Sequence, residues 1–306
     1  MTEVIYSTIS DYVTEVAQSE EPRRVSVSGV LKILGVSRSG YISWCNRLPS
    51  KSKLRKEAVK SRIKDIHDDS KQNYGAPKIT KVLQSEGEVI SERTVGTYMK
   101  EMDVKAQWVR PWTKTTRNSD FSSRLQNLLN REFNPEHPDA VWCSDITYIW
   151  TVEGYSYLTT VMDLFSRCIL SWTLTQTLDK SCVIEAINKA KNRRGNINPK
   201  LIHSDRGSQY VSFDYVEAAA GSLLSYSDKG NPYDNACIES FHSLIKREWL
   251  SRFQIRNHMH ARGLVFEYID TFYNTVRIHS HCDYLSPAEF EEMYRLSKEI
   301  ELQKAS

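Results

Sequence analysis

The sequence lacks the features that mark several common protein classes. Its 306 residues contain no uninterrupted run of about 18 apolar residues, and the first ten do not join a basic segment to an apolar one. Its six cysteines are scattered without a CxxC pair, which argues against a disulfide framework and a zinc ribbon. We therefore expect neither membrane insertion nor secretion, but a globular protein with reduced thiols in the cytoplasm.

Basic residues are absent from one short stretch and concentrated in the next. Residues 1–21 contain no Lys or Arg and five acids, whereas residues 22–117 contain 21 bases and 9 acids. Residues 118–306 contain 20 bases and 24 acids, so the net charge of +3 conceals a basic front and a mildly acidic back. Such a front is typical of a phosphate-binding surface, although a solvated charged face would have the same composition.

The basic front contains two candidate helix-turn-helix segments. The smaller spans 27–47 and has Ser37 as a predicted N-cap. In the larger, Pro77 begins one helix, Gly87 ends it and Ser91 caps a second. In such motifs the second helix enters the DNA major groove, and a helical hairpin packed on another element is the alternative. The outward residues of this second helix would be Arg93, Thr94, Thr97 and Lys100.

The second half of the chain has the pattern of a mixed β-sheet. Three strand-like runs in close succession are followed by alternating helices and strands. The expected strands are 141–150, 155–165, 168–176, 201–204 and 223–226, and the expected helices are 179–192, 213–220 and long segments from about 235. This order predicts an α/β fold in which a ribonuclease H-like core, a mixed five-stranded sheet with flanking helices, follows the α-helical helix-turn-helix regions.

Carboxylates occupy unusual positions in this predicted core. Asp145 lies inside an apolar strand, where an acid is costly unless it is paired or binds a cation. Asp205 ends the fourth strand, and Glu239 shares one helix face with His242 and Lys246. Carboxylates from separate elements suit Mg²⁺ or Mn²⁺, and two such ions support in-line phosphodiester displacement. The pattern nominates Asp145 and Asp205 and leaves the third acid open, because other acids lie in this half: Asp163, Asp179, Asp214, Asp228 and Asp234.

Three ordered sequence blocks resemble one known family. The blocks 142–148 (WCSDITY), 203–210 (HSDRGSQY) and 229–241 (KGNPYDNACIESF) look like the catalytic blocks of bacterial insertion-sequence transposases related to retroviral integrases. Segments 74–100, 268–277 and 285–290 are similar to other parts of the same group, whose transposase is made from two overlapping reading frames. The resemblance spans about residues 25–290.

This resemblance implies a DDE-type transposase in which Asp145, Asp205 and Glu239 are the catalytic residues and hold two Mg²⁺ or Mn²⁺ ions. The family reaction cleaves one strand at an element end, joins the freed 3′-OH to the other end and later integrates the circular product. The implied partners are double-stranded DNA at the terminal inverted repeats and in the target, a homo-oligomer of at least two chains, and the upstream-frame product. The DNA-binding candidates are Lys246, His242, Arg206, Lys229, Asn235, Arg93, Thr94, Thr97, Lys100, Arg110 and Lys114.

Two departures from the family pattern leave alternatives open. The 33 residues between Asp205 and Glu239 are slightly fewer than usual, with the shortening expected near 213–223, and residues 1–21 are too short for the upstream helix-turn-helix and leucine zipper. The chain is then either the second-frame product or a compact single-frame relative. An inactive end-binding repressor and a ribonuclease H-like nuclease are the competing functions. We also expect Trp142, Tyr148 and Trp150 to be core residues, with base stacking as the alternative.

The expected organisation follows from these assignments, with a bacterial, nucleoid-associated cytoplasmic location. Its parts are an acidic amphipathic prefix (1–21), a small helix-turn-helix-like segment (22–50), a basic tether with a helix-turn-helix DNA-binding domain (51–110), a basic and aromatic connector (111–134), a ribonuclease H-like integrase catalytic core (135–255) and a C-terminal helical segment (256–306).

Overall fold

A computed structural model describes residues 2–18, 26–107, 125–228 and 231–305. Three of the predicted DNA-binding residues, Arg110, Lys114 and Lys229, lie outside these ranges. Residue contacts divide the chain into two compact units, Met1–Arg62 and Ile63–Ser306. No helix within the described ranges is both long and apolar enough to cross a bilayer.

The first unit is a small helical cluster. It contains α1 (Thr2–Gln18), α2 (Val27–Ile33), α3 (Arg38–Cys45) and the beginning of α4 (Lys51–Asp69). Tyr6 and Ile9 of α1 pack against Leu31 of α2 and Tyr41 of α3. Ser37 caps α3 by accepting a hydrogen bond from the Gly40 N–H at 3.2 Å. Helix α1 lies in the acidic prefix, and α2 and α3 occupy the segment 27–47 that is predicted as a small helix-turn-helix.

The second unit begins with the larger helix pair. This pair consists of α5 (Ala76–Ser85) and α6 (Glu92–Glu101), which bury Ile79 and Val95 between them. Ser91 caps α6 by accepting from the Thr94 N–H at 3.3 Å, as predicted. Before α5, the Tyr74 hydroxyl accepts from the Ile278 N–H at 2.8 Å, which ties this turn to the C-terminal part of the same unit.

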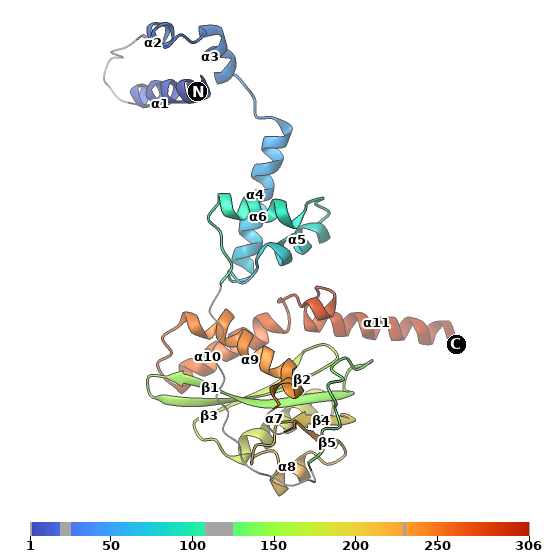
Figure 1. The fold of residues 1–306 in the computed structure, drawn as a ribbon. Coiled ribbons are helices and arrows are strands. Elements are labelled where there is room, and N and C mark those ends of the chain that lie inside the picture. The colour runs from blue at the N-terminus through green and yellow to red at the C-terminus, as the bar shows by residue number, and fades with distance from the viewer. Residues whose placement is uncertain (1, 19–25, 108–124, 229–230, 306) are drawn as a thin grey trace. The chain divides into compact units, whose positions relative to one another are not determined.

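A mixed five-stranded sheet forms the centre of the second unit, as the sequence predicted (Figure 1). Its order is β3-β2-β1-β4-β5; β1, β2 and β3 pair antiparallel, and β4 and β5 continue parallel to β1. Helix α7 connects β3 to β4, and α8 connects the parallel neighbours β4 and β5, which cannot be joined by a hairpin. The strands are β1 (Val141–Thr151), β2 (Gly154–Asp163), β3 (Ile169–Thr175), β4 (Leu201–Ser204) and β5 (Leu223–Tyr226), with α7 at Lys180–Arg193 and α8 at Phe213–Ala218.

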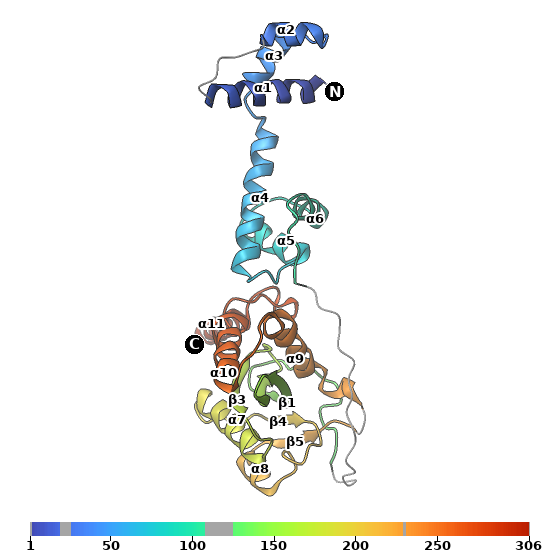
Figure 2. The ribbon, with the colours of Figure 1, turned by 90° about the vertical axis from the view of Figure 1, so that its left-hand side faces the viewer.

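Two hydrophobic cores lie on opposite faces of this sheet. Helices α9 (Ala236–Glu248) and α10 (His258–Tyr268) cover one face, and α7 and α8 cover the other (Figures 1 and 2). Alternation along β1 sends Cys143 into the α9 core and Trp142 into the α7 core. The remaining elements are the short helices η1 (Pro232–Asn235), η2 (Leu250–Arg252), η3 (Ile269–Tyr273) and η4 (Ser280–Cys282), and the C-terminal α11 (Pro287–Ala305).

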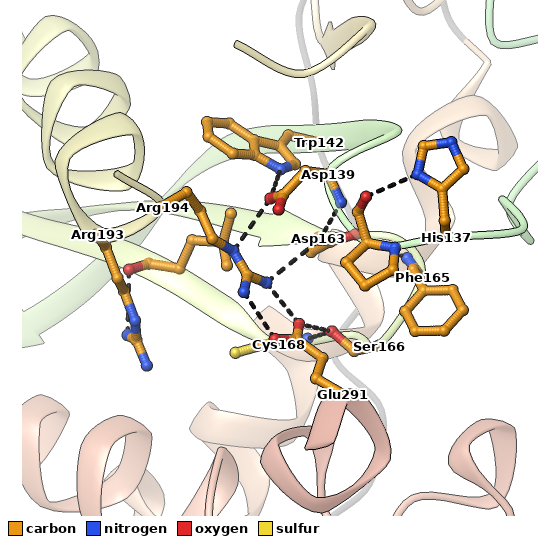
Figure 3. A network of polar contacts seen from close by, with 12 residues as sticks. His137, Asp139, Trp142, Asp163, Phe165, Ser166, Cys168, Arg193, Arg194 and Glu291 are labelled. Carbon is orange, nitrogen blue, oxygen red and sulfur yellow. Dashed lines mark hydrogen bonds and ion pairs between the residues drawn. The ribbon is translucent and has the colours of Figure 1, made fainter. Parts of the chain in front are cut away.

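A buried polar network joins the end of β2 to α11 (Figure 3). Asp163 is fully buried and accepts from the backbone N–H groups of Asp139 at 2.8 Å and Phe165 at 2.9 Å. Arg194, at the end of α7, lies 3.3 Å from the Asp163 carboxylate, 3.0 Å from that of Asp139 and 2.5 Å from that of Glu291 on α11. Burial raises the pKa of Asp163 to about 7. One guanidinium therefore compensates three acids from separate segments.

Candidate active site

Strand register brings two of the predicted catalytic acids together. Strands β1 and β4 are parallel, with Cys143 paired to His203. Asp145 lies two residues further along β1, and Asp205 is the first residue after β4. Continuing the register by two residues sets Asp145 beside Asp205 on the α9 face, at the spacing of about 4.8 Å between neighbouring strands. The carboxyl end of a strand is also where α/β folds place their ligands.

The turn after β4 holds the Asp205 carboxylate in place. Its Oδ1 accepts a hydrogen bond from the Gly207 N–H at 2.9 Å. A Cβ on Gly207 would lie 2.9 Å from the same oxygen, so any other residue here would require the Asp205 carboxylate to shift. Further along, the buried Tyr210 hydroxyl lies 3.0 Å from Ser144 Oγ on β1. The turn is thus fastened under the strand that carries Asp145.

Helix α9 contributes an imidazole and the third acid. His242 is buried, with Nδ1 3.3 Å from Asp145 Oδ2 and Nε2 2.8 Å from Thr160 Oγ1. Thr160 is the β2 residue paired with Asp145, so the ring bridges two adjacent strands. Glu239 is half-buried and lies three residues earlier on α9, on the same helical face. Glu239 therefore shares a helical face with the ring that contacts Asp145.

Titratable neighbours show that the two strand carboxylates share one electrostatic environment. Burial raises the pKa of Tyr148, and the nearby charges of Asp145 and Asp205 raise it further. The pKa of Tyr210 is raised by burial and then by the same two acids. Desolvation lowers the pKa of Lys246 on α9, and the Asp145 carboxylate opposes this shift. Lys246 therefore lies within electrostatic reach of Asp145.

The donor chemistry fits a hard divalent cation. Asp145, Asp205 and Glu239 offer only carboxylate oxygens, the ligands that Mg²⁺ and Mn²⁺ prefer. Within the described ranges, however, no three or more His, Cys, Asp or Glu side chains form a group that could hold a metal ion. One oxygen of Asp145 is instead directed at His242. The residues suited to a metal site are thus neighbours that are not gathered around one point.

Two further DNA-binding candidates near α9 have different surroundings. Asn235 is buried just before α9, and its side-chain Nδ2 has no hydrogen-bond partner among the described residues. A buried amide donor without a partner is costly. Arg206 instead donates through Nε to the Ser227 carbonyl at 2.7 Å and lies 3.2 Å from Asp228. Its guanidinium already ties the turn to the end of β5.

The four residues of α6 that are predicted to face DNA have different environments: three are exposed, and one takes part in the helix cap. Arg93, Thr97 and Lys100 are exposed. The Thr94 hydroxyl lies 2.9 Å from Ser91 Oγ and takes part in the helix cap. Of the four predicted residues, Arg93, Thr97 and Lys100 therefore lie on the surface of this helix.

Sequence reasoning missed several side chains around the acids. Thr160 and Gly207 were not singled out, although a polar residue in a buried strand and a glycine two residues after an acid are visible in the sequence. The expectation that Tyr148 and Trp150 are core residues was wrong, because they are 53% and 63% exposed. Trp142 is fully buried, as expected.

Comparison with known proteins places the chain in a family. A transposase for the insertion sequence element IS904 of Lactococcus lactis is 37% identical over 253 residues, covering 81% of this chain and 98% of the relative. Transposase InsF for insertion sequence IS3A of Escherichia coli is 33% identical over 271 residues, covering 87% and 94%. The chain belongs to the insertion-sequence transposases. The family resemblance seen in the sequence is thereby confirmed.

Domain-level matches agree with this transposase assignment. The integrase core domain matches residues 135–232 and, in a second family description, 220–287, while an HTH-like domain matches 54–112. The integrase matches contain all five strands, α9 and the three carboxylates of the transposase. Among solved structures, the HTLV-2 integrase catalytic core in complex with magnesium aligns at 15% identity with a TM-score of 0.40, over 51% of this chain and 98% of that one.

Proposed function

We propose that this transposase cleaves and joins DNA strands at the ends of its insertion sequence through Asp145, Asp205 and Glu239. The observation that carries the proposal is the β1–β4 register, which pairs Cys143 with His203 and, continued by two residues, would bring Asp145 beside Asp205. Support for the third acid comes from His242, which connects the face of α9 that carries Glu239 to Asp145. Each acid comes from a different element, so their arrangement depends on the folded core.

The three carboxylates would hold two Mg²⁺ or Mn²⁺ ions. When bound, such ions activate the attacking hydroxyl and stabilise the leaving oxygen of a phosphodiester. His242 orients the Asp145 carboxylate through its Nδ1 while Thr160 holds its other nitrogen, so we assign this buried ring to positioning rather than to DNA contact. Lys246 places a positive charge near Asp145, where it would contact a DNA phosphate.

DNA recognition would use the helical front of the chain. Arg93, Thr97 and Lys100 lie on the second helix of a helix-turn-helix, the element that enters the major groove in this motif. Its targets would be the terminal inverted repeats, and target DNA would be engaged at the core. Joining two ends requires at least two chains on DNA, in the bacterial cytoplasm beside the nucleoid. The upstream-frame product is a further proposed partner.

Replacement of Asp145 tests the assignment directly. Asp145→Asn keeps the shape of the side chain and removes its charge, so we expect loss of Mg²⁺-dependent cleavage and joining with binding to the terminal repeats retained. Asp214→Asn is the matched control, because Asp214 is an acid of the same core that pairs with Lys180 on α7. Gel assays with labelled element ends measure all three activities. Equal joining by wild type and Asp145→Asn would refute the assignment.

The competing functions give different results in the same assay. A chain that binds the repeats and never cuts them, with either Mg²⁺ or Mn²⁺, would be an end-binding repressor. A chain that cleaves RNA in an RNA–DNA hybrid but joins no DNA would be a ribonuclease H-like nuclease. Metal-dependent joining that is lost in Asp145→Asn and retained in Asp214→Asn would support the transposase mechanism.

A further inference from the structure

An exposed aromatic cluster lies on the β1–β2 hairpin beyond the catalytic acids. We call Tyr148, Trp150, Tyr155 and Tyr157 the hairpin cluster. Cross-strand pairing sets Tyr148 opposite Tyr157 and Trp150 opposite Tyr155. Ring centroids are 5.5 Å apart in the first pair, 4.8 Å in the second and 6.1 Å between Tyr148 and Tyr155. These four rings therefore form one continuous surface.

The hairpin cluster leaves much more ring surface in water than pairing across strands requires. Tyr148, Trp150 and Tyr155 are 53%, 63% and 54% exposed. Cross-strand aromatic pairs contribute to hairpin stability, but they do so equally well when a helix covers them. A contiguous exposed apolar patch on a folded domain usually marks a binding surface.

The short β4 leaves this part of the hairpin open at its edge. Strand β4 ends at Ser204, which corresponds to Ser144 in the β1 register, whereas β1 continues to Thr151. Alternation points Tyr148 and Trp150 to the face opposite Asp145. A DNA strand that crosses this open edge would meet Asp145 on one side and the aromatic rings on the other. The influence of Asp145 and Asp205 on the pKa of Tyr148 agrees with this closeness.

The chemistry of the hairpin favours nucleobases over phosphates as the ligand. Residues 141–163 contain no Lys or Arg, so the hairpin itself offers no positive charge to a DNA backbone. Aromatic rings on a sheet face stack bases in RNA-binding domains, and stacking tolerates any base because each has a π-face. Bases within a duplex are already stacked, so only unpaired nucleotides can use such a surface.

We propose that the hairpin cluster is a stacking platform for unpaired nucleotides at a DNA end held by the catalytic acids. The proposal rests on the proposed function, since a DNA end must be bound at Asp145 and Asp205. Trp150 has the largest ring system and the greatest exposure of the three rings for which exposure is given above. Its ring is therefore expected to contribute most to stacking.

Binding of two DNA probes to the full-length chain tests the platform. One probe is a blunt duplex of the terminal repeat, and the other adds a short single-stranded extension that contains 2-aminopurine. Stacking of one base contributes enough that Trp150→Leu should lower affinity for the extended probe about tenfold and abolish 2-aminopurine quenching. Trp150→Phe, which keeps a ring, should retain most of both signals. Affinity for the blunt probe should be the same in all three proteins.

Several outcomes would overturn the proposal. Equal affinity of the wild type for both probes, or equal quenching by wild type and Trp150→Leu, would show that bases do not stack there. A change in oligomeric state in Trp150→Leu, measured by sedimentation without any change in DNA affinity, would identify the surface as a protein interface. Tyr155→Leu repeats the test if Trp150→Leu fails to fold. Asp145→Asn should keep the quenching, so failure of the catalytic assignment remains distinguishable from failure of the platform.

Discussion

Removing the guanidinium of Arg194 should destabilise the core in a pH-dependent way. Arg194→Met keeps most of the side-chain volume but leaves Asp163 and its two neighbouring acids without a cation. Breaking a buried pair by removing one partner costs about 3–5 kcal/mol. Total stabilities of domains are about 5–15 kcal/mol, so this loss is measurable in a urea titration followed by circular dichroism.

The sign of the pH effect follows from Asp163. Its pKa in the folded protein is about 7, above the ordinary value of 3.8, so its contribution to stability is full below pH 3.8 and is lost as the pH rises through 7. Without the guanidinium the pKa of Asp163 rises further, so at about pH 8 the variant must either bury an uncompensated carboxylate or bind a proton, and a loss of about 3–5 kcal/mol is expected. At about pH 5.5 the carboxyl is protonated, and the loss should fall to about 2 kcal/mol from broken hydrogen bonds.

A second substitution separates charge from packing at this site. Asp163→Asn removes the charge, but the N–H groups of Asp139 and Phe165 donate to different carboxylate oxygens, so the single amide oxygen of Asn can accept from only one of them. Combined with Arg194→Met, the Asp163→Asn substitution should restore part of the lost free energy of unfolding at about pH 8 and little at about pH 5.5. A loss that is the same at both pH values, with no coupling between the two substitutions, would refute the charge-compensation argument.

Three further substitutions test the site and the DNA-binding helix. His242→Leu should weaken Mn²⁺ binding, measured by calorimetry, about 10–100-fold, and unchanged affinity would remove its positioning role. Gly207→Ala should displace the Asp205 carboxylate and slow strand joining about 10–100-fold. Gly263→Ala is the control, because its Cβ would meet nothing within 4 Å and should leave strand joining unchanged. Arg93→Ala should reduce the slope of log affinity against log salt concentration, measured for binding to the terminal repeats, by the amount expected for about one phosphate contact. An unchanged slope would place this residue away from the DNA.

Local patterns were sufficient to predict the elements of the fold. The sheet and the capped helices depend on short-range alternation and on cap residues such as Ser91, which can be read directly from the sequence. Two of the candidate acids, Asp145 and Asp205, stood out because acids are rare in and beside buried strands. Their register agrees with that choice, while metal binding by these acids stays a prediction.

Contacts between distant segments could not be predicted in the same way. The exposure of Tyr148 and Trp150 depends on where β4 ends relative to β1, which no local pattern specifies. The position of His242 against Asp145 depends on how α9 crosses the sheet. These features arise from tertiary packing, which sets burial independently of the residue type.

The connection of α11 to Arg194 bears on when the chain becomes functional during synthesis. Chains fold from the N-terminus as they are translated, and all five strands precede residue 227. Glu291 pairs with the Arg194 guanidinium, which also contacts Asp163 at the end of β2. Glu291 is translated well after these strands. A nascent transposase thus has its strands long before its charge network is complete. Premature termination soon after Glu239 would release a core that lacks this last acid partner and the helix that carries it.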